Sequence, residues 1–227
     1  MPEWSTYSLA NFLMFSARTY YRLFERHNAA VWPAHLAALA AGVIILVALF
    51  RPSANGGRIS AALLAAAWLF VAWAYLFRAY STIHWAGRYF AAAFAAQAGL
   101  LLWRGVVRPQ LSFASRGSAA AQAGLGLFAF ALLLQPLAGL FAGRPWTQLE
   151  VFGLTPDPTA TATLGLLVAV GRAGWMLWPI PLGWCAFSTA TLWTMHPPDW
   201  FVLPLLGLVS LAFALSGRLR GGGVIVT

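Results

Sequence analysis

The residues best suited to acid–base or ion-binding chemistry are few in this sequence, and they gather in a small number of loops. Two of the five acidic residues, Glu150 and Asp157, fall within the segment EVFGLTPDPTATATLG. Asp199 ends the motif HPPD, which His196 begins. Carboxylates and imidazoles together suit a divalent cation or a proton relay. We therefore take these four residues, together with His84, as a candidate polar vestibule for a small solute or ion.

Two of these acids also have the sequence context of helix caps. Asp157 stands before a proline, an order in which the carboxylate accepts hydrogen bonds from first-turn amides and the proline needs no donor of its own. Asp199 follows two prolines and precedes another apolar run. Capping is the simpler interpretation of both acids, but it leaves Glu150 unexplained. No spacing matches a metal-ligand motif such as H-E-x-x-H.

Arg172 is the remaining candidate for a binding residue. It lies in VAVGRAGWMLW, fourteen residues into an expected helix that begins at residue 159. Charges inside a membrane are costly and usually face a bundle interior or a cavity, where this one would contact an anion, a carboxylate or a lipid headgroup. The alternative is that its long side chain snorkels to the membrane surface.

The elements that must position these residues are transmembrane helices. Hydrophobic residues make up 61% of the chain and charged residues 8%, with a mean hydropathy of +0.74. A soluble domain contains about 25% charged residues. Apolar stretches of the bilayer-spanning length, about 17 to 25 residues, recur along the sequence. The fold class is therefore an all-α, polytopic transmembrane helix bundle.

About seven spans are expected, preceded by an amphipathic helix at the membrane interface. The spans occupy residues 31–50, 59–77, 89–107, 119–143, 159–178, 182–195 and 200–216. Residues 1–30 form the interfacial segment, 31–216 the transmembrane domain, and 217–227 a flexible tail. Pro136 should kink the fourth span. Small residues at four-residue spacing, as at Gly139 and Gly143, predict close helix packing.

Seven spans would place every acid and every histidine on one side of the membrane, and arginine alone on the other. All fourteen cationic residues are arginine, and the net charge of +9 is spread through short loops. Arg18, Arg22 and Arg26 recur every four residues and form one stripe on a helix. This pattern predicts contact with anionic lipid and argues against nucleic acid as a partner. The loop arginines favour a cytoplasmic location for the side without acids.

The sequence contains no enzyme signature. It has no G-x-S-x-G elbow, zinc motif or phosphate-binding glycine loop, and its single cysteine, Cys185, excludes an internal disulfide. No cofactor is expected. The composition, the kinked fourth span and the short sixth span between the proline breaks PIP and HPPD favour permease-like binding or passage of a small solute or ion between helices. The alternative is a non-catalytic accessory subunit that packs against a partner protein or forms a homo-oligomer.

Two stretches carry a resemblance to a known family. They are FSARTYYRLFERHNAAVWPA, residues 15–34, and EVFGLTPDPTATATLG, residues 150–165. Together they resemble a family of small bacterial multi-pass membrane proteins of unknown function, whose members are sometimes labelled transporter permeases. The resemblance implies a location in the bacterial inner membrane, and it implies no catalytic residue.

Overall fold

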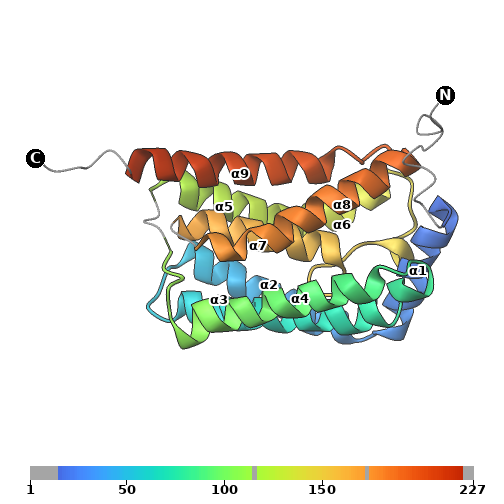
Figure 1. Ribbon diagram of the computed structural model, residues 1–227, viewed down its shortest axis with the longest axis horizontal. Helices are drawn as coiled ribbons and strands as arrows, with labels where there is room; N and C mark the ends of the chain where they lie inside the picture. The colour runs from blue at the N-terminus through green and yellow to red at the C-terminus, as the bar shows by residue number, and fades with distance from the viewer. Residues whose placement is uncertain (1–14, 114–116, 172–173, 222–227) are drawn as a thin grey trace, which may run out of the picture.

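The computed structural model describes residues 15–113, 117–171 and 174–221, and within these ranges it contains helices and no strand. Most of the helices lie side by side along one axis, whereas the first helix lies across one end of the bundle (Figure 1). The predicted all-α class is confirmed. The α-helices are α1 (Ala17–Ala30), α2 (Ala34–Phe50), α3 (Gly56–Phe70), α4 (Gly87–Leu101), α5 (Ala119–Ala129), α6 (Gln135–Phe141), α7 (Pro156–Val170), α8 (Pro179–Met195) and α9 (Val202–Gly221).

Three helical segments are long and apolar enough to cross a membrane: Gly56–Thr82, Gly87–Val107 and Ala119–Phe141. A fourth arises if α1 and α2, which are bent by 93° to each other, count as one span. Among the described residues the structure thus supports three or four spans, and the expected seven are not supported. Each of the three segments contains a π-helical turn, at Val71–Phe77, Leu102–Val107 and Phe130–Leu134. The last of these precedes Pro136, where a kink was expected, since proline removes a helix hydrogen bond.

Helix α7 explains part of the difference in span count. It has 15 residues, or about 22 Å at 1.5 Å per residue, which is shorter than a bilayer core of about 30 Å. The helix expected at residues 159–178 ends early because Gly171 adopts a φ of 69°, a conformation that favours glycine. Helix α9 extends to Gly221, five residues into the expected tail, although its shorter apolar part is Val202–Ser216.

All fifteen residues of α7 are buried, so this helix forms the centre of the bundle. It packs most closely on α5, where a Cβ added to Gly124 would lie 2.5 Å from the Gly165 carbonyl oxygen. The two backbones are therefore in direct contact, as small residues allow. The expected seam at Gly143 is not such a contact, because a Cβ there would meet open space.

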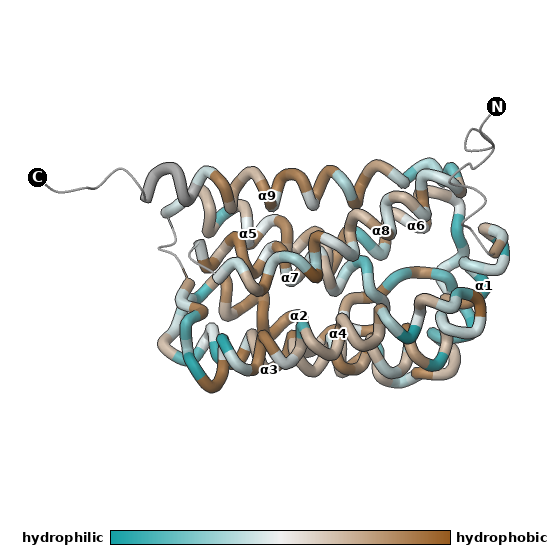
Figure 2. Tube along the Cα trace, viewed as in Figure 1, coloured by the Kyte–Doolittle hydropathy of each residue, from teal (hydrophilic) through white to brown (hydrophobic). Residues whose placement is uncertain are grey.

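Helix α1 is amphipathic, as the arginine spacing predicts. Ser16 caps it by accepting a hydrogen bond from the Thr19 amide (3.2 Å), and its buried face includes Leu23, Phe24 and His27. The three arginines of the stripe are exposed. Hydrophilic stretches of the chain concentrate in α1 and in the loops at the two ends of the bundle (Figure 2). Most hydrophilic residues of the described chain therefore lie at the two ends of the bundle.

Candidate functional site

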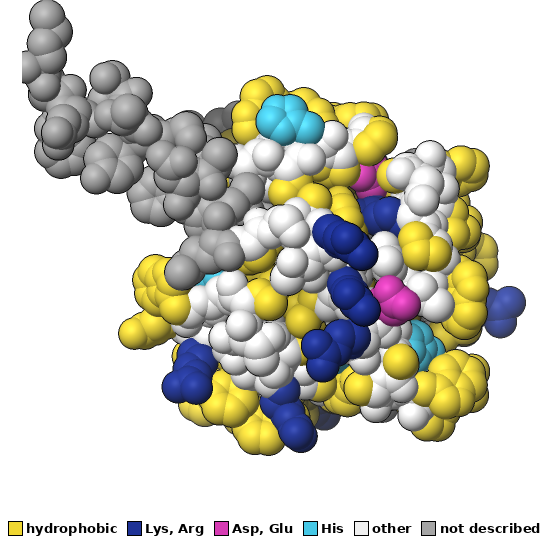
Figure 3. All heavy atoms as spheres, turned by 90° about the vertical axis from the view of Figure 1, so that its right-hand side faces the viewer, with side chains coloured by type: hydrophobic (Ala, Val, Ile, Leu, Met, Phe, Trp, Pro, Cys, Tyr) yellow, Lys and Arg dark blue, Asp and Glu magenta, His cyan; other side chains and the backbone are white. Residues whose placement is uncertain are grey.

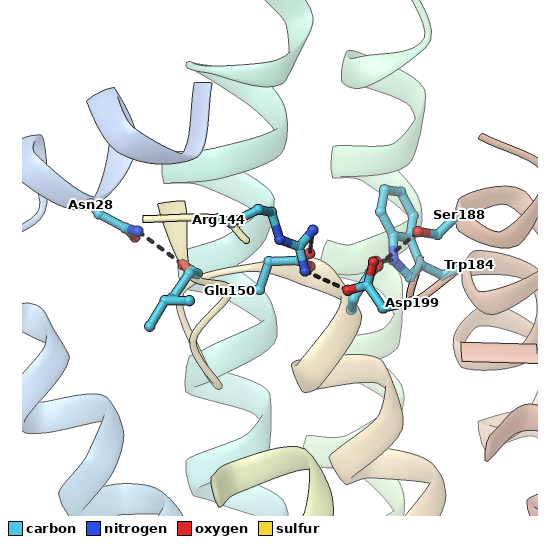
Figure 4. A network of polar contacts seen from close by, with 8 residues as sticks. Asn28, Arg144, Glu150, Trp184, Ser188 and Asp199 are labelled. Carbon is cyan, nitrogen blue, oxygen red and sulfur yellow. Dashed lines mark hydrogen bonds and ion pairs between the residues drawn. The ribbon is translucent and has the colours of Figure 1, made fainter. Parts of the chain in front are cut away.

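Arg144, in the loop between α6 and α7, connects two of the predicted acids (Figure 4). Its Nη2 lies 2.6 Å from Asp199 Oδ2, and its Nη1 lies 3.9 Å from Glu150 Oε1. The three side chains are only 12%, 18% and 10% exposed, respectively. Within the described ranges these are the two ion pairs of the protein. Sequence reasoning missed Arg144 because, beside a proline just after a helix, it resembles any loop arginine.

Asp157 lies in the first turn of α7 and is almost completely buried. Its two carboxylate oxygens accept hydrogen bonds from Trp184 Nε1 (2.7 Å) and Ser188 Oγ (2.8 Å), both on α8. The predicted capping role is therefore wrong: the N-cap residue is Thr155, and it has no side-chain cap bond. The acid instead joins α7 to α8, because long-range donors reach both of its oxygens.

Asp199 does not cap the following helix either. Helix α9 begins at Val202, and the Asp199 carboxylate points to Arg144 through Oδ2. Its Oδ1 is buried without a hydrogen-bond partner in the described chain. The strong attraction of the largely buried Arg144 guanidinium outweighs the local preference for capping.

Glu150 is the most perturbed acid of the cluster. It is 9% exposed, and no donor of the described chain reaches its Oε2. Burial, followed by the negative charge of Asp157, raises the pKa of Glu150 well above its usual value, although Arg144 opposes the shift. Burial favours the neutral form of a carboxyl group, so Glu150 holds a proton more tightly than an exposed glutamate.

Other buried polar atoms near Arg144 also lack hydrogen-bond partners among the described residues. They include Asn28 Oδ1 and Arg144 Nε, in addition to the carboxylate oxygens of Glu150 and Asp199. The Nδ2 of Asn28 donates to the carbonyl oxygens of Thr147 (3.0 Å) and Leu149 (2.9 Å), which ties α1 to the loop that carries Glu150. Each such unpartnered group costs about 1–3 kcal/mol, so their concentration marks a place where a proton, water or an ion would bind favourably.

Aromatic rings connect Asp157 with one of the two candidate histidines. The Trp184 ring, which donates to Asp157, lies 5.6 Å from the Phe187 ring. The His84 ring lies 5.5 Å from the Tyr80 ring and 6.0 Å from the Phe187 ring of α8. Burial lowers the pKa of His84, which favours its neutral form. His196 is exposed at the end of α8, where its Nδ1 lies 3.2 Å from the Thr194 carbonyl oxygen. No hydrogen bond of the described chain joins either histidine to the carboxylates.

The structure therefore brings together Glu150, Asp157 and Asp199 from the predicted vestibule, with Arg144 as the added member. We call these four residues the acidic cluster. Among the described residues no three His, Cys, Asp or Glu side chains are arranged to hold a metal ion. Arg172 lies outside the described residues.

The fold and the cluster define a class: an all-helical protein with membrane-length apolar helices and a buried charge network near one end of its bundle. The chain belongs to the family of unknown function DUF6064, whose model matches residues 17–222. The resemblance to a family of unknown function is thus confirmed. No curated protein and no solved structure matches the chain.

Proposed function

We propose that this protein is a permease-like protein of the bacterial inner membrane that takes up a proton at the acidic cluster and couples it to passage of a small solute or ion. The observation that carries the proposal is the imbalance of charge. Three carboxylates face one guanidinium, so the cluster carries two surplus negative charges when all four groups are ionised. Uncompensated charge in an apolar interior is unfavourable, and binding of a cation relieves it.

A proton is the cation that Glu150 suits best. Its raised pKa has a physical cause in burial and in the neighbouring Asp157 charge, and no donor among the described residues reaches its Oε2. The cluster also lies where α7 begins between other helices, and helix ends inside a bundle commonly form transporter binding sites. His84 and His196 stay candidates for the outer part of the pathway, and Arg172, which lies outside the described residues, stays a candidate for a charge within it.

The experiment is proton flux into proteoliposomes. Full-length protein is reconstituted with a pH-sensitive dye inside, and a potassium diffusion potential drives protons inward. We expect flux above that of empty liposomes, reduced at least about tenfold in Glu150→Gln, since that change removes the proton-accepting oxygen. Glu25→Gln is the matched control, because Glu25 is exposed. Equal flux in empty and loaded liposomes would contradict the proposal.

The alternative is an accessory subunit without a pathway of its own, and the broad apolar surface of the outer helices suits it. On α2, Leu36 and Val47 are 62% and 51% exposed, and on α9, Leu208 is 65% exposed. Lipid or a partner subunit would cover these side chains equally well. An accessory subunit predicts no flux for any variant, with cluster substitutions changing only stability or assembly.

A further inference from the structure

The exposed arginines of α1 line a groove at the end of the bundle. Two adjoining cavities, of about 760 and 640 Å³, flank α1 and share Leu23, Arg26 and Thr82 in their walls. The first also includes Arg18 and Arg22, and the second includes Arg78 from the neighbouring span. We call this feature the arginine groove. Figure 3 shows arginine side chains gathered on this end of the molecule.

The positive charge of the arginine groove is unbalanced. The four arginines, Arg18, Arg22, Arg26 and Arg78, are all exposed, and the two ion pairs found in the described ranges both belong to Arg144. Glu25 is the one acid in the walls of the two cavities, and its Oε2 accepts a hydrogen bond from Gln148 Nε2 (3.3 Å). The groove therefore presents a net charge of about +3, which attracts anions.

The orientation of α1 would suit contact of this charge with lipid headgroups. The 93° bend between α1 and α2 means that α1 lies along the membrane surface if α2 crosses it. Trp73, in the wall of the groove, is 59% exposed, and Trp32, which follows the wall residue Val31 in the chain, is 64% exposed. Exposed tryptophan is typical of the interface between the bilayer core and its headgroups.

We propose that the arginine groove binds the phosphate of an anionic phospholipid headgroup. Guanidinium groups present paired N–H donors that match two phosphate oxygens, and several of them on one helix face recognise anionic lipid more strongly than zwitterionic lipid. The cavities leave room for a headgroup beside Arg26, while the acyl chains lie along the exposed aromatic and aliphatic side chains. The proposal rests on the membrane location of the protein and not on ion passage.

Native mass spectrometry of the full-length protein tests the site. The protein in detergent is titrated with phosphatidylglycerol, with phosphatidylcholine of the same chains, and with inorganic phosphate. We expect bound phosphatidylglycerol in preference to phosphatidylcholine, with affinity reduced at least about tenfold when Arg18, Arg22, Arg26 and Arg78 are all changed to glutamine. The affinity of the double variant Arg22→Gln/Arg26→Gln for phosphatidylglycerol should lie between those of the unchanged protein and the quadruple variant. If the quadruple variant does not fold, the double variant tests the proposal.

The matched control is Arg51→Gln/Arg108→Gln, which removes two exposed arginines at the opposite end of the bundle. Its affinity for phosphatidylglycerol should equal that of the unchanged protein. Equal binding of phosphatidylglycerol by the groove variants overturns the proposal, as does equal binding of the two lipids. Inorganic phosphate binding as tightly as phosphatidylglycerol would also overturn it, since the site would then serve a free anion.

Discussion

The two ends of the bundle differ in the partners of their arginine side chains. At the end covered by α1, the Arg144 guanidinium is buried and pairs with Glu150 and Asp199. At the opposite end, Arg58 donates to the Val106 carbonyl oxygen (3.3 Å from Nη2), and Arg108 lies 4.9 Å from the centre of the Trp103 ring. No described acid lies at that end. Arginines that reach solvent need no carboxylate, whereas one enclosed by helices does.

The comparison indicates that a carboxylate partner matters for a buried arginine and matters little for an exposed one. Surface charge pairs contribute about 0–1 kcal/mol, so the opposite end gains little from acids. Removing one partner of a buried pair costs about 3–5 kcal/mol, because it leaves the other charge uncompensated. Glu150 and Asp199 therefore lie where a buried cation pairs with them, whereas Trp184 and Ser188 hold Asp157.

Substitution of Arg144 should have the largest effect. Arg144→Ala leaves the carboxylates of Glu150 and Asp199 buried without a partner, and we expect the free energy of unfolding to fall by about 3–5 kcal/mol. Arg58→Ala at the opposite end should cost about 1 kcal/mol or less, since its partner carbonyl can bind water instead. Chemical unfolding in detergent micelles measures both.

A compensated variant provides the control for that comparison. When Arg144→Ala is combined with Glu150→Gln and Asp199→Asn, the charges of both ion pairs are removed together, and most of the lost stability should return. If the triple variant is as unstable as Arg144→Ala alone, the loss comes from packing and the contrast between the two ends is not electrostatic.

Helices α5 and α7 pack closely between the two ends of the bundle. Substitution of two glycines of α5 tests this close packing. A Cβ at Gly124 would overlap the α7 backbone, so Gly124→Ala should destabilise the protein by about 1–3 kcal/mol. A Cβ at Gly126 meets nothing within 4 Å, and Gly126→Ala should stabilise the helix by about 0.5–1 kcal/mol. Thermal unfolding midpoints of the two variants should move in opposite directions. Shifts of the same sign would mean that the two helices are not in backbone contact.

The pH dependence of stability should distinguish the acidic cluster from the opposite end. Because burial raises the pKa of Glu150, the folded protein binds this proton more tightly than the unfolded chain does. The free energy of unfolding should therefore fall as pH rises from about 4.3, the usual carboxyl pKa, to the pKa in the folded protein, by at most about 1.4 kcal/mol per pH unit. Glu150→Gln should flatten this part of the profile. Parallel profiles for the two proteins would show that Glu150 does not carry the proton.

The sequence predicted the features that depend on local pattern. Apolar runs predicted the helices that end at Phe50 and Val107, and the four-residue arginine spacing predicted the amphipathic α1. The hydrogen-bond partners that lie far apart in the sequence could not be predicted in this way. Asp157 has the local sequence of a cap, but Trp184 and Ser188, far along the chain, bind its oxygens. A local rule identifies which groups need partners, and only the packed helices decide which partners they receive.

The same limit applies to Arg144 and to the close seam. Nothing in the residues next to Arg144 indicates burial, since this arises when Tyr21 of α1 and Asp199, in the connection between α8 and α9, meet the Arg144 side chain. The seam depends on one glycine from each of two helices, Gly124 and Gly165, so spacing within a single helix does not reveal it. The acids could be identified from type and spacing, but their common cation could not.

The smallest predicted effect compares two arginine–aromatic contacts of equal length. Arg144 lies 4.9 Å from the centre of the Tyr21 ring, and Arg108 lies 4.9 Å from that of Trp103. Cation–π attraction is about 0.5–1 kcal/mol at exposed sites and about 2 kcal/mol when water is excluded. Since Trp103 is 48% exposed while the Arg144 side chain is 12% exposed, the Arg144–Tyr21 pair should couple more strongly, by about 1 kcal/mol.

Two double-mutant cycles measure this difference, each with the arginine changed to glutamine and the aromatic residue to leucine. The cycle subtracts the separate cost of each change, so the loss of the Arg144 ion pairs does not enter the coupling energy. Equal coupling energies would mean that water reaches Arg144 as freely as Arg108. The acidic cluster would then be a wet surface feature, and the surplus charge on which the proposed proton uptake depends would be screened at both ends of the bundle.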